Sequence, residues 1–197
     1  MLSSITPLGE RGRNNRWGVT AASYVSGSVL GGSSIGAALG ALGSVVPRSP
    51  RLALGALAAA AAVGLLVELG LAGARLPTNH RQVNERWLDQ YRGWVYGLGY
   101  GFQLGLGVVT IVTSGLTYLA LIAALLCHSW FGGLAIGATF GLVRSLPLLS
   151  AAGVGQTAAL GHLLSRNDRW APIARRIGLG GQLCALVAAI AAMMVFS

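Results

Sequence analysis

From Gly93 to Leu160 the chain is almost unbroken apolar sequence, and this run limits what the chain can fold into. A helix crosses the hydrocarbon core of a bilayer with about 20 apolar residues, so the run is long enough for more than one crossing. It contains Arg144, whose charge costs on the order of 3 kcal/mol at membrane depth. It also contains Pro147, a residue that breaks or kinks helices. The run therefore predicts membrane helices with one polar interruption.

The composition supports a membrane protein. Hydrophobic residues make up 54% of the chain and charged residues only 10%, whereas about a quarter of an ordinary globular domain is charged. The net charge is +9, which in a soluble protein would suggest nucleic acid. Here the arginines lie mainly in short connections between apolar runs. We therefore expect the lipid bilayer as the environment, no nucleic-acid partner, and one all-α transmembrane domain over residues 1–197.

Five apolar segments are long enough to be membrane helices. They cover about residues 17–46, 52–74, 93–126, 131–160 and 177–196, with a polar cytoplasmic loop at 75–92. The third is longer than one perpendicular crossing needs, so we expect it to be tilted, to project from the bilayer, or to be broken. A six-span alternative would require residues 93–160 to cross three times, and no polar turn supports that.

The distribution of arginine predicts the orientation. All fourteen basic residues are arginines, and they concentrate in the N-terminal segment, in the 75–92 loop and in residues 162–176. Only Arg48 and Arg51 fall in connections on the opposite side. Because cytoplasmic loops collect positive charge, we expect a bacterial inner-membrane protein with its N-terminus inside and its C-terminus outside. The first apolar segment lacks a clear cleavage site, so we interpret it as a retained span.

Three glycine ladders repeat every fourth residue within the spans. They comprise Gly32, Gly36 and Gly40; Gly93, Gly97, Gly101 and Gly105; and Gly133, Gly137 and Gly141. This spacing places small residues on one helical face, where a second backbone can approach closely. The ladders predict tight helix–helix packing, either within the chain, in a homo-oligomer, or with partner membrane subunits.

Two charges lie well inside the spans, Glu68 and Arg144. The second and fourth spans run in the same direction, which brings the two residues to compatible depths. We therefore predict a Glu68–Arg144 pair that offsets the cost of the arginine. Such a pair could bind an ion, a proton or an anionic substrate. It could equally fix the register of two helices, or the arginine could reach toward the inner headgroups.

Further polar residues inside the spans are candidates for a substrate or ion site. Pro147 removes a backbone hydrogen bond and is expected to free the carbonyl near Val143. Hydroxyl and amide side chains at membrane depth either bond neighbouring helices or contact a substrate. The remaining candidates are Ser145, Thr110, Thr113, Ser114 and Gln103.

The sequence predicts no catalytic residue, no metal site and no cofactor. Cys127 and Cys184 are too far apart in sequence to form a CxxC motif, and their expected depths in the membrane differ. The three histidines are scattered over both sides of the predicted bundle.

The segment from Ile136 to Ser150 resembles a helix of the cytochrome c biogenesis transmembrane family, the disulfide-electron carriers. Members have a glycine-rich helix that ends in a similar Gly-x-x-x-x-Leu-Pro-Leu-Leu run, and Gly99–Tyr118 is similar to a helix of the family's second repeat. The family has a redox cysteine beside a proline, where this chain has Thr110–Ser114. The resemblance implies a transporter-like scaffold that lacks those cysteines and cannot shuttle electrons by thiol exchange.

Two functional hypotheses follow. The first is a small transporter or permease-like protein with a polar site in the inner half of the bilayer, near Glu68 and Arg144. The alternative is a non-catalytic subunit or assembly factor of a larger membrane complex. A transporter predicts a cavity that reaches Arg144, and a subunit predicts a glycine face that is open to a partner.

Overall fold

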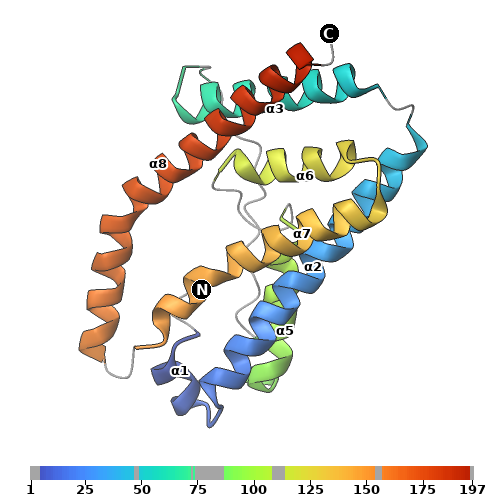
Figure 1. The fold of residues 1–197 in the computed structure, drawn as a ribbon. Helices are drawn as coiled ribbons and strands as arrows, with labels where there is room; N and C mark the ends of the chain where they lie inside the picture. The colour runs from blue at the N-terminus through green and yellow to red at the C-terminus, as the bar shows by residue number, and fades with distance from the viewer. Residues whose placement is uncertain are drawn as a thin grey trace.

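The computed structural model describes residues 5–46, 49–71, 73, 87–107, 114–153 and 157–195. All secondary structure within these ranges is helical, which confirms the all-α prediction (Figure 1). The elements in chain order are α1 (Pro7–Gly12), α2 (Trp17–Val45), α3 (Pro50–Glu68), α4 (Trp87–Gln90), α5 (Gly93–Gly105), α6 (Leu116–Leu126), α7 (Trp130–Ser145), the 3₁₀ helix η1 (Leu146–Ala151) and α8 (Thr157–Val195).

Within the described ranges, four helical segments are long and apolar enough to cross a membrane. They are Trp17–Val45, Pro50–Glu68, Trp130–Ala151 and Arg169–Val195. The shorter apolar helix α6 accompanies them. A bundle of this kind is a polytopic helical membrane protein, as the sequence predicts.

The predicted third span, residues 93–126, is two helices rather than one. α5 ends at Gly105, and Gly107 follows with a φ of 78°, a left-handed conformation that glycine adopts without strain. α6 begins at Leu116. Of the three possibilities raised by the length of this segment, a break is therefore the one found.

Other boundaries also differ from the predicted ones. The second span ends at Glu68 rather than at residue 74. The fourth changes from α-helix to 3₁₀ helix at Leu146 and stops at Ala151, short of residue 160. The polar stretch 162–176, expected to precede the last span, lies inside α8, which contains Pro172. Alanine, leucine and arginine are good helix formers, so this stretch continues the helix despite its polarity.

α2 is the central helix, and its glycines contact two neighbours. On one side Gly32 faces Gly137 and Gly36 faces Gly133, so α7 runs antiparallel to α2. A Cβ atom at any of these four positions would overlap the backbone of the opposite helix. Two glycine ladders therefore pack directly against each other.

On its other side α2 packs in parallel with α5. Gly27 faces the backbone of Leu98, and Gly31 faces that of Phe102. In turn, Gly105 of α5 faces the backbone of Ser28 on α2. Figure 1 shows α2, α5 and α7 as one closely packed group. The prediction of glycine-ladder packing is confirmed, and these ladders are used within the chain.

A second group consists of α3 and α8, with α6 between it and α2 (Figure 1). α3 and α8 are antiparallel, since Gly55 lies near Met193 and Gly64 lies against Gln182. Their outward sides are apolar and exposed, as at Leu52, Val63 and Val187.

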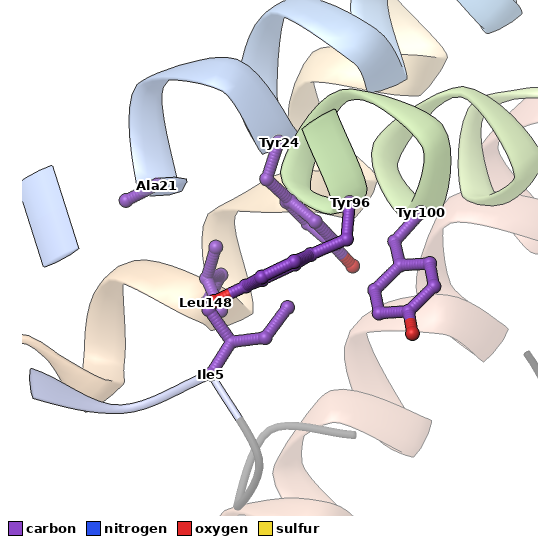
Figure 2. Packing of buried hydrophobic residues seen from close by; sticks show 6 residues of the cluster. All are labelled: Ile5, Ala21, Tyr24, Tyr96, Tyr100 and Leu148. Atoms are coloured by element: carbon purple, nitrogen blue, oxygen red, sulfur yellow. The ribbon is translucent and has the colours of Figure 1, made fainter. Parts of the chain in front are cut away.

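The N-terminal end of α2 carries a buried cluster that attaches α1 to the bundle. Figure 2 shows Tyr24, Tyr96 and Tyr100 gathered with Ile5, Ala21 and Leu148. Beside this cluster the fully buried carboxylate of Glu10 accepts hydrogen bonds from the hydroxyls of Tyr96 and Thr20, the latter at 2.8 Å. This network joins α1 to α2 and α5, and Leu148 brings η1 into the cluster.

Candidate functional site

Arg144 lies in the last turn of α7 and reaches toward the end of α5. Its guanidinium donates a hydrogen bond of 3.1 Å to the carbonyl oxygen of Gly107. The same guanidinium lies 5.5 Å from the centre of the Phe140 ring, a cation–π distance. The break between α5 and α6 therefore supplies a backbone oxygen to the intramembrane arginine.

The turn after Arg144 is locally well bonded. The side chain of Ser145 is fully buried, and its hydroxyl donates to the Leu142 carbonyl at 2.7 Å. The carbonyl of Val143 accepts the backbone N–H of Leu146. The predicted free carbonyl at Val143 is therefore wrong, because the change to 3₁₀ geometry supplies a donor one residue before Pro147.

An open groove runs between α6 and α7 and has Arg144 in its lining. Its volume is about 660 Å³. The residues that line it are Ser114, Leu116, Thr117, Ala120, Ala135, Ile136, Thr139, Phe140, Val143 and Arg144. The lining is thus mainly apolar, with three hydroxyls and one guanidinium. Arg144 supplies the only charge among these lining residues.

Glu68 lies at a different junction, where α3 ends beside the start of α6. Its carboxylate accepts the backbone N–H of Gly115, just before α6, where the helix dipole favours a negative charge. Its backbone carbonyl accepts a hydrogen bond from Arg175 of α8. Glu68 thus contacts Gly115 and Arg175, while Arg144 contacts Gly107 and Phe140. None of these contacts joins Glu68 to Arg144, so the pair stays a prediction.

Gln182 of α8 is a polar residue that the sequence reasoning missed. Its side chain is fully buried and lies against Gly64 of α3 and Gly115 of α6. Neither its amide nitrogen nor its amide oxygen has a hydrogen-bond partner. Leaving a buried amide unpaired costs roughly 1–3 kcal/mol. The sequence feature that indicates this residue is a single glutamine within the last apolar run.

The remaining predicted residues are dispersed. Ser114 lines the groove, and its hydroxyl accepts the Leu116 N–H at 3.3 Å. Gln103 is half-buried on α5 and is not among the residues that line the groove. Thr110 and Thr113 lie outside the described residues. The structure therefore brings together Arg144 and Ser114, and adds Thr117 and Thr139 to them.

Neither cysteine is among the residues that line the groove with Arg144. Cys127 follows α6, where its thiol contacts the carbonyls of Ala124 and Ser129, and Cys184 is exposed on α8. Both are free thiols. In the part of the chain that the structure describes, no group of three or more histidine, cysteine or acidic side chains could hold a metal ion.

Comparison with known proteins gives a consistent result. The family model described as the cytochrome C biogenesis protein transmembrane region matches residues 3–195. The chain is 33% identical to the methylamine utilization protein MauF of Paracoccus versutus over 74% of its length, and 30% identical to MauF of Methylophilus methylotrophus over 75%. MauF of Paracoccus denitrificans is 32% identical over 74%.

The chain spans about half the length of these relatives, covering 56%, 53% and 55% of them respectively. No solved structure matches the chain.

Proposed function

The chain belongs to the cytochrome c biogenesis protein transmembrane family, and on this basis we propose that it is a non-catalytic membrane subunit or assembly factor that serves methylamine utilization. In this role it would work with partner membrane subunits and carry no redox centre of its own. The observation that carries the proposal is its similarity to three methylamine utilization proteins over about three quarters of the chain.

The residues of the groove support an accessory role over electron transfer. Thiol exchange needs an accessible thiolate close to a partner thiol. The residues that line the groove instead supply hydroxyls and a guanidinium. Cys127 follows α6 and Cys184 lies on α8, and neither is among the residues that line the groove. These residue types suit the binding of a partner or an anionic group.

The surfaces open to partners are not the ones expected from the sequence. The ladders of α2, α5 and α7 face one another, so they do not present an open glycine face to another subunit. Two other surfaces are open to another subunit: the exposed apolar sides of α3 and α8, and the α6–α7 groove. We assign partner contacts to these surfaces.

A growth experiment tests the proposal. We expect deletion of the gene from its host to abolish growth on methylamine as sole nitrogen source, with normal growth on ammonium. Wild-type protein and the double variant Cys127→Ser/Cys184→Ser should both restore growth, because no thiol chemistry is involved. Unimpaired growth of the deletion strain would contradict the proposal. Failure of the double variant, at normal protein level, would indicate a redox role instead.

We further propose an inner-membrane location with the N-terminus in the cytoplasm. Arg11, Arg13, Arg16 and Arg92 flank the same end of the α2–α5 pair, and positive residues concentrate on the cytoplasmic side. Fusion of a periplasm-active reporter to each terminus tests this. Activity should appear at the C-terminal fusion, and an active N-terminal fusion would reverse the orientation.

Transport is the second candidate, because the groove contains Arg144. A guanidinium attracts anions, so this site would suit an anionic solute and repel methylammonium. Uptake of labelled small carboxylates into proteoliposomes tests it. If the protein is a transporter, the wild type should take up the labelled carboxylate and Arg144→Gln should not. Absence of uptake by the wild type would reject the transport function.

A further inference from the structure

We propose that one face of α8 binds the phosphate groups of anionic phospholipids through the guanidinium groups of Arg169 and Arg176. The face belongs to residues 169–176, which we term the basic segment. The inference goes beyond the proposed accessory function and does not depend on it. Three features of the structure carry it: the level of the basic segment in the bilayer, the exposure of its side chains, and its charge.

The length of α3 shows where the basic segment meets the edge of the bilayer. α3 has 19 residues, about 28 Å at 1.5 Å per residue, which is close to the thickness of a bilayer core. Its two ends therefore lie near the two edges of the core. α8 runs antiparallel to α3, and Arg175 donates a hydrogen bond to the backbone carbonyl of Glu68, the last residue of α3. Arg175 thus lies at one edge of the core, where the headgroups begin.

The other two arginines of the basic segment lie at the same edge. Arg169 precedes Arg175 along α8 by about 9 Å, in the direction that leads out of the core. Arg176 follows Arg175 directly, and helical side chains lean toward the N-terminus of their helix, which here means toward the headgroups. Because α2 and α3 are consecutive spans with a short connection, this is also the side on which α2 begins. It is the side that we propose as cytoplasmic, where the surface potential of the membrane is negative.

The side chains of the basic segment are open to an occupant. Every residue of the segment is exposed, and Trp170 is 58% exposed. Arg169 and Arg176 form no hydrogen bond or ion pair with another residue in the described part of the chain. Figure 1 shows the N-terminal half of α8, at the lower left, standing apart from α2 and α5. An occupant of this face therefore reaches both guanidinium groups without displacing a protein contact.

Arg169 and Arg176 share one face of α8. They are separated by two helical turns, which correspond to about 10 Å along the axis. Ile173 lies between them on this face and is 42% exposed. Gly178 lies on the opposite side of the helix, where it is buried near the hydroxyl of Ser114. The basic face therefore points away from the bundle, while the opposite face of α8 packs against it.

Charge complementarity identifies the occupant. The basic segment contains three arginines and no acidic residue, and the acidic residue directly before it, Asp168, leaves a net charge of +2. A guanidinium binds two oxygens of a phosphate group in a bidentate arrangement. The exposed Trp170 and Ile173 suit the boundary between headgroups and acyl chains. A phospholipid supplies both a phosphate and an apolar chain at this level, whereas an acidic protein loop would supply only the charge.

Native mass spectrometry of the full chain in a neutral detergent tests this inference. The protein is titrated with phosphatidylglycerol and, in a parallel series, with phosphatidylcholine that has the same acyl chains. Each series gives the dissociation constant of the first bound lipid. The test variant is Arg169→Gln/Arg176→Gln. The matched control is Arg11→Gln/Arg16→Gln, which removes the same charge from two exposed arginines on the same side of the membrane.

We expect the wild type to bind phosphatidylglycerol about tenfold more tightly than phosphatidylcholine, because each basic residue near an anionic surface strengthens binding about fivefold. The test variant should lose this preference, and the control variant should keep it.

Equal binding of the two lipids by the wild type would overturn the inference, whether or not the test variant folds. A preference that survives in the test variant, or that falls equally in both variants, would also overturn it, because another surface or the net charge would then be responsible. Displacement of phosphatidylglycerol by an equal concentration of glycerol phosphate would assign the face to a soluble phosphate compound, with the same consequence. The growth experiment tests the proposed function separately, since none of these results depends on it.

Discussion

The two groups of helices in this protein are held together by different means. In the first group, α2 contacts α5 and α7 through glycine backbones, and Ser28 adds a 2.7 Å hydrogen bond to the Gly141 carbonyl. In the second group, polar groups lie where α3 and α8 meet α6: the Glu68 carboxylate accepts the Gly115 N–H, and the buried Gln182 amide is left unpaired. The first group is thus a scaffold in which backbone contacts leave no space for larger side chains. The second group contains a buried polar side chain without a hydrogen-bond partner.

The comparison predicts the largest effect for a bulky residue within the scaffold. A Cβ at Gly36 would overlap the Gly133 carbonyl, and both neighbours are backbone that cannot rotate away. We expect Gly36→Leu to force α2 and α7 apart and to cost about 3 kcal/mol or more, the upper range for overpacking. Thermal unfolding in detergent, followed by size-exclusion chromatography with fluorescence detection, measures this.

Gly18 on the same helix provides the control. A Cβ there would meet nothing within 4 Å, so Gly18→Ala should leave stability unchanged or raise it by up to about 1 kcal/mol through helix propensity. The comparison of Gly36→Ala with Gly18→Ala then isolates the contact from the propensity. If the two alanine variants unfold at the same temperature, the close packing of α2 and α7 does not hold.

The sequence predicted the scaffold because its signal is local. Glycine at every fourth residue defines a helical face without knowledge of the partner helix, and the Arg144–Pro147 stretch marks the end of α7. The ladder of α2 did not reveal which helix it contacts, because all three ladders are equivalent in sequence.

The polar contacts of the second group could not be predicted in the same way. The partner of Glu68 depends on where α6 begins, and that position follows from the break at Gly107. The burial of Gln182 depends on the register between α3 and α8. Glu10 lies in the arginine-bearing N-terminal segment, yet its side chain is fully buried and bonded to Tyr96 and Thr20. Each of these outcomes is set by tertiary packing.

In the second group we expect a substitution to raise the free energy of unfolding, by an amount smaller than the loss in Gly36→Leu. Gln182→Leu removes two unpaired polar atoms at nearly constant volume, so we expect it to stabilise the protein by about 1–3 kcal/mol. Thermal unfolding of the purified protein measures this. Gln103→Leu on α5 is the matched variant at a half-buried position, where a smaller change is expected. Destabilisation by Gln182→Leu would show that the amide is paired in the folded protein.

The smallest effect tests what hydrogen bonding adds to a scaffold that is already held by shape. Ser28→Ala removes the interhelical bond to the Gly141 carbonyl while keeping the small side chain that the contact needs. Hydrogen bonds between membrane helices contribute about 0.6 kcal/mol on average, so we expect a loss of about 0.5–1 kcal/mol. Ser34→Ala is the matched control, since the exposed Ser34 bonds only the Leu30 carbonyl of its own helix in the contacts described. A loss in Ser28→Ala as large as that in Gly36→Leu would mean that polar contacts hold both groups of helices, and the contrast between them would disappear.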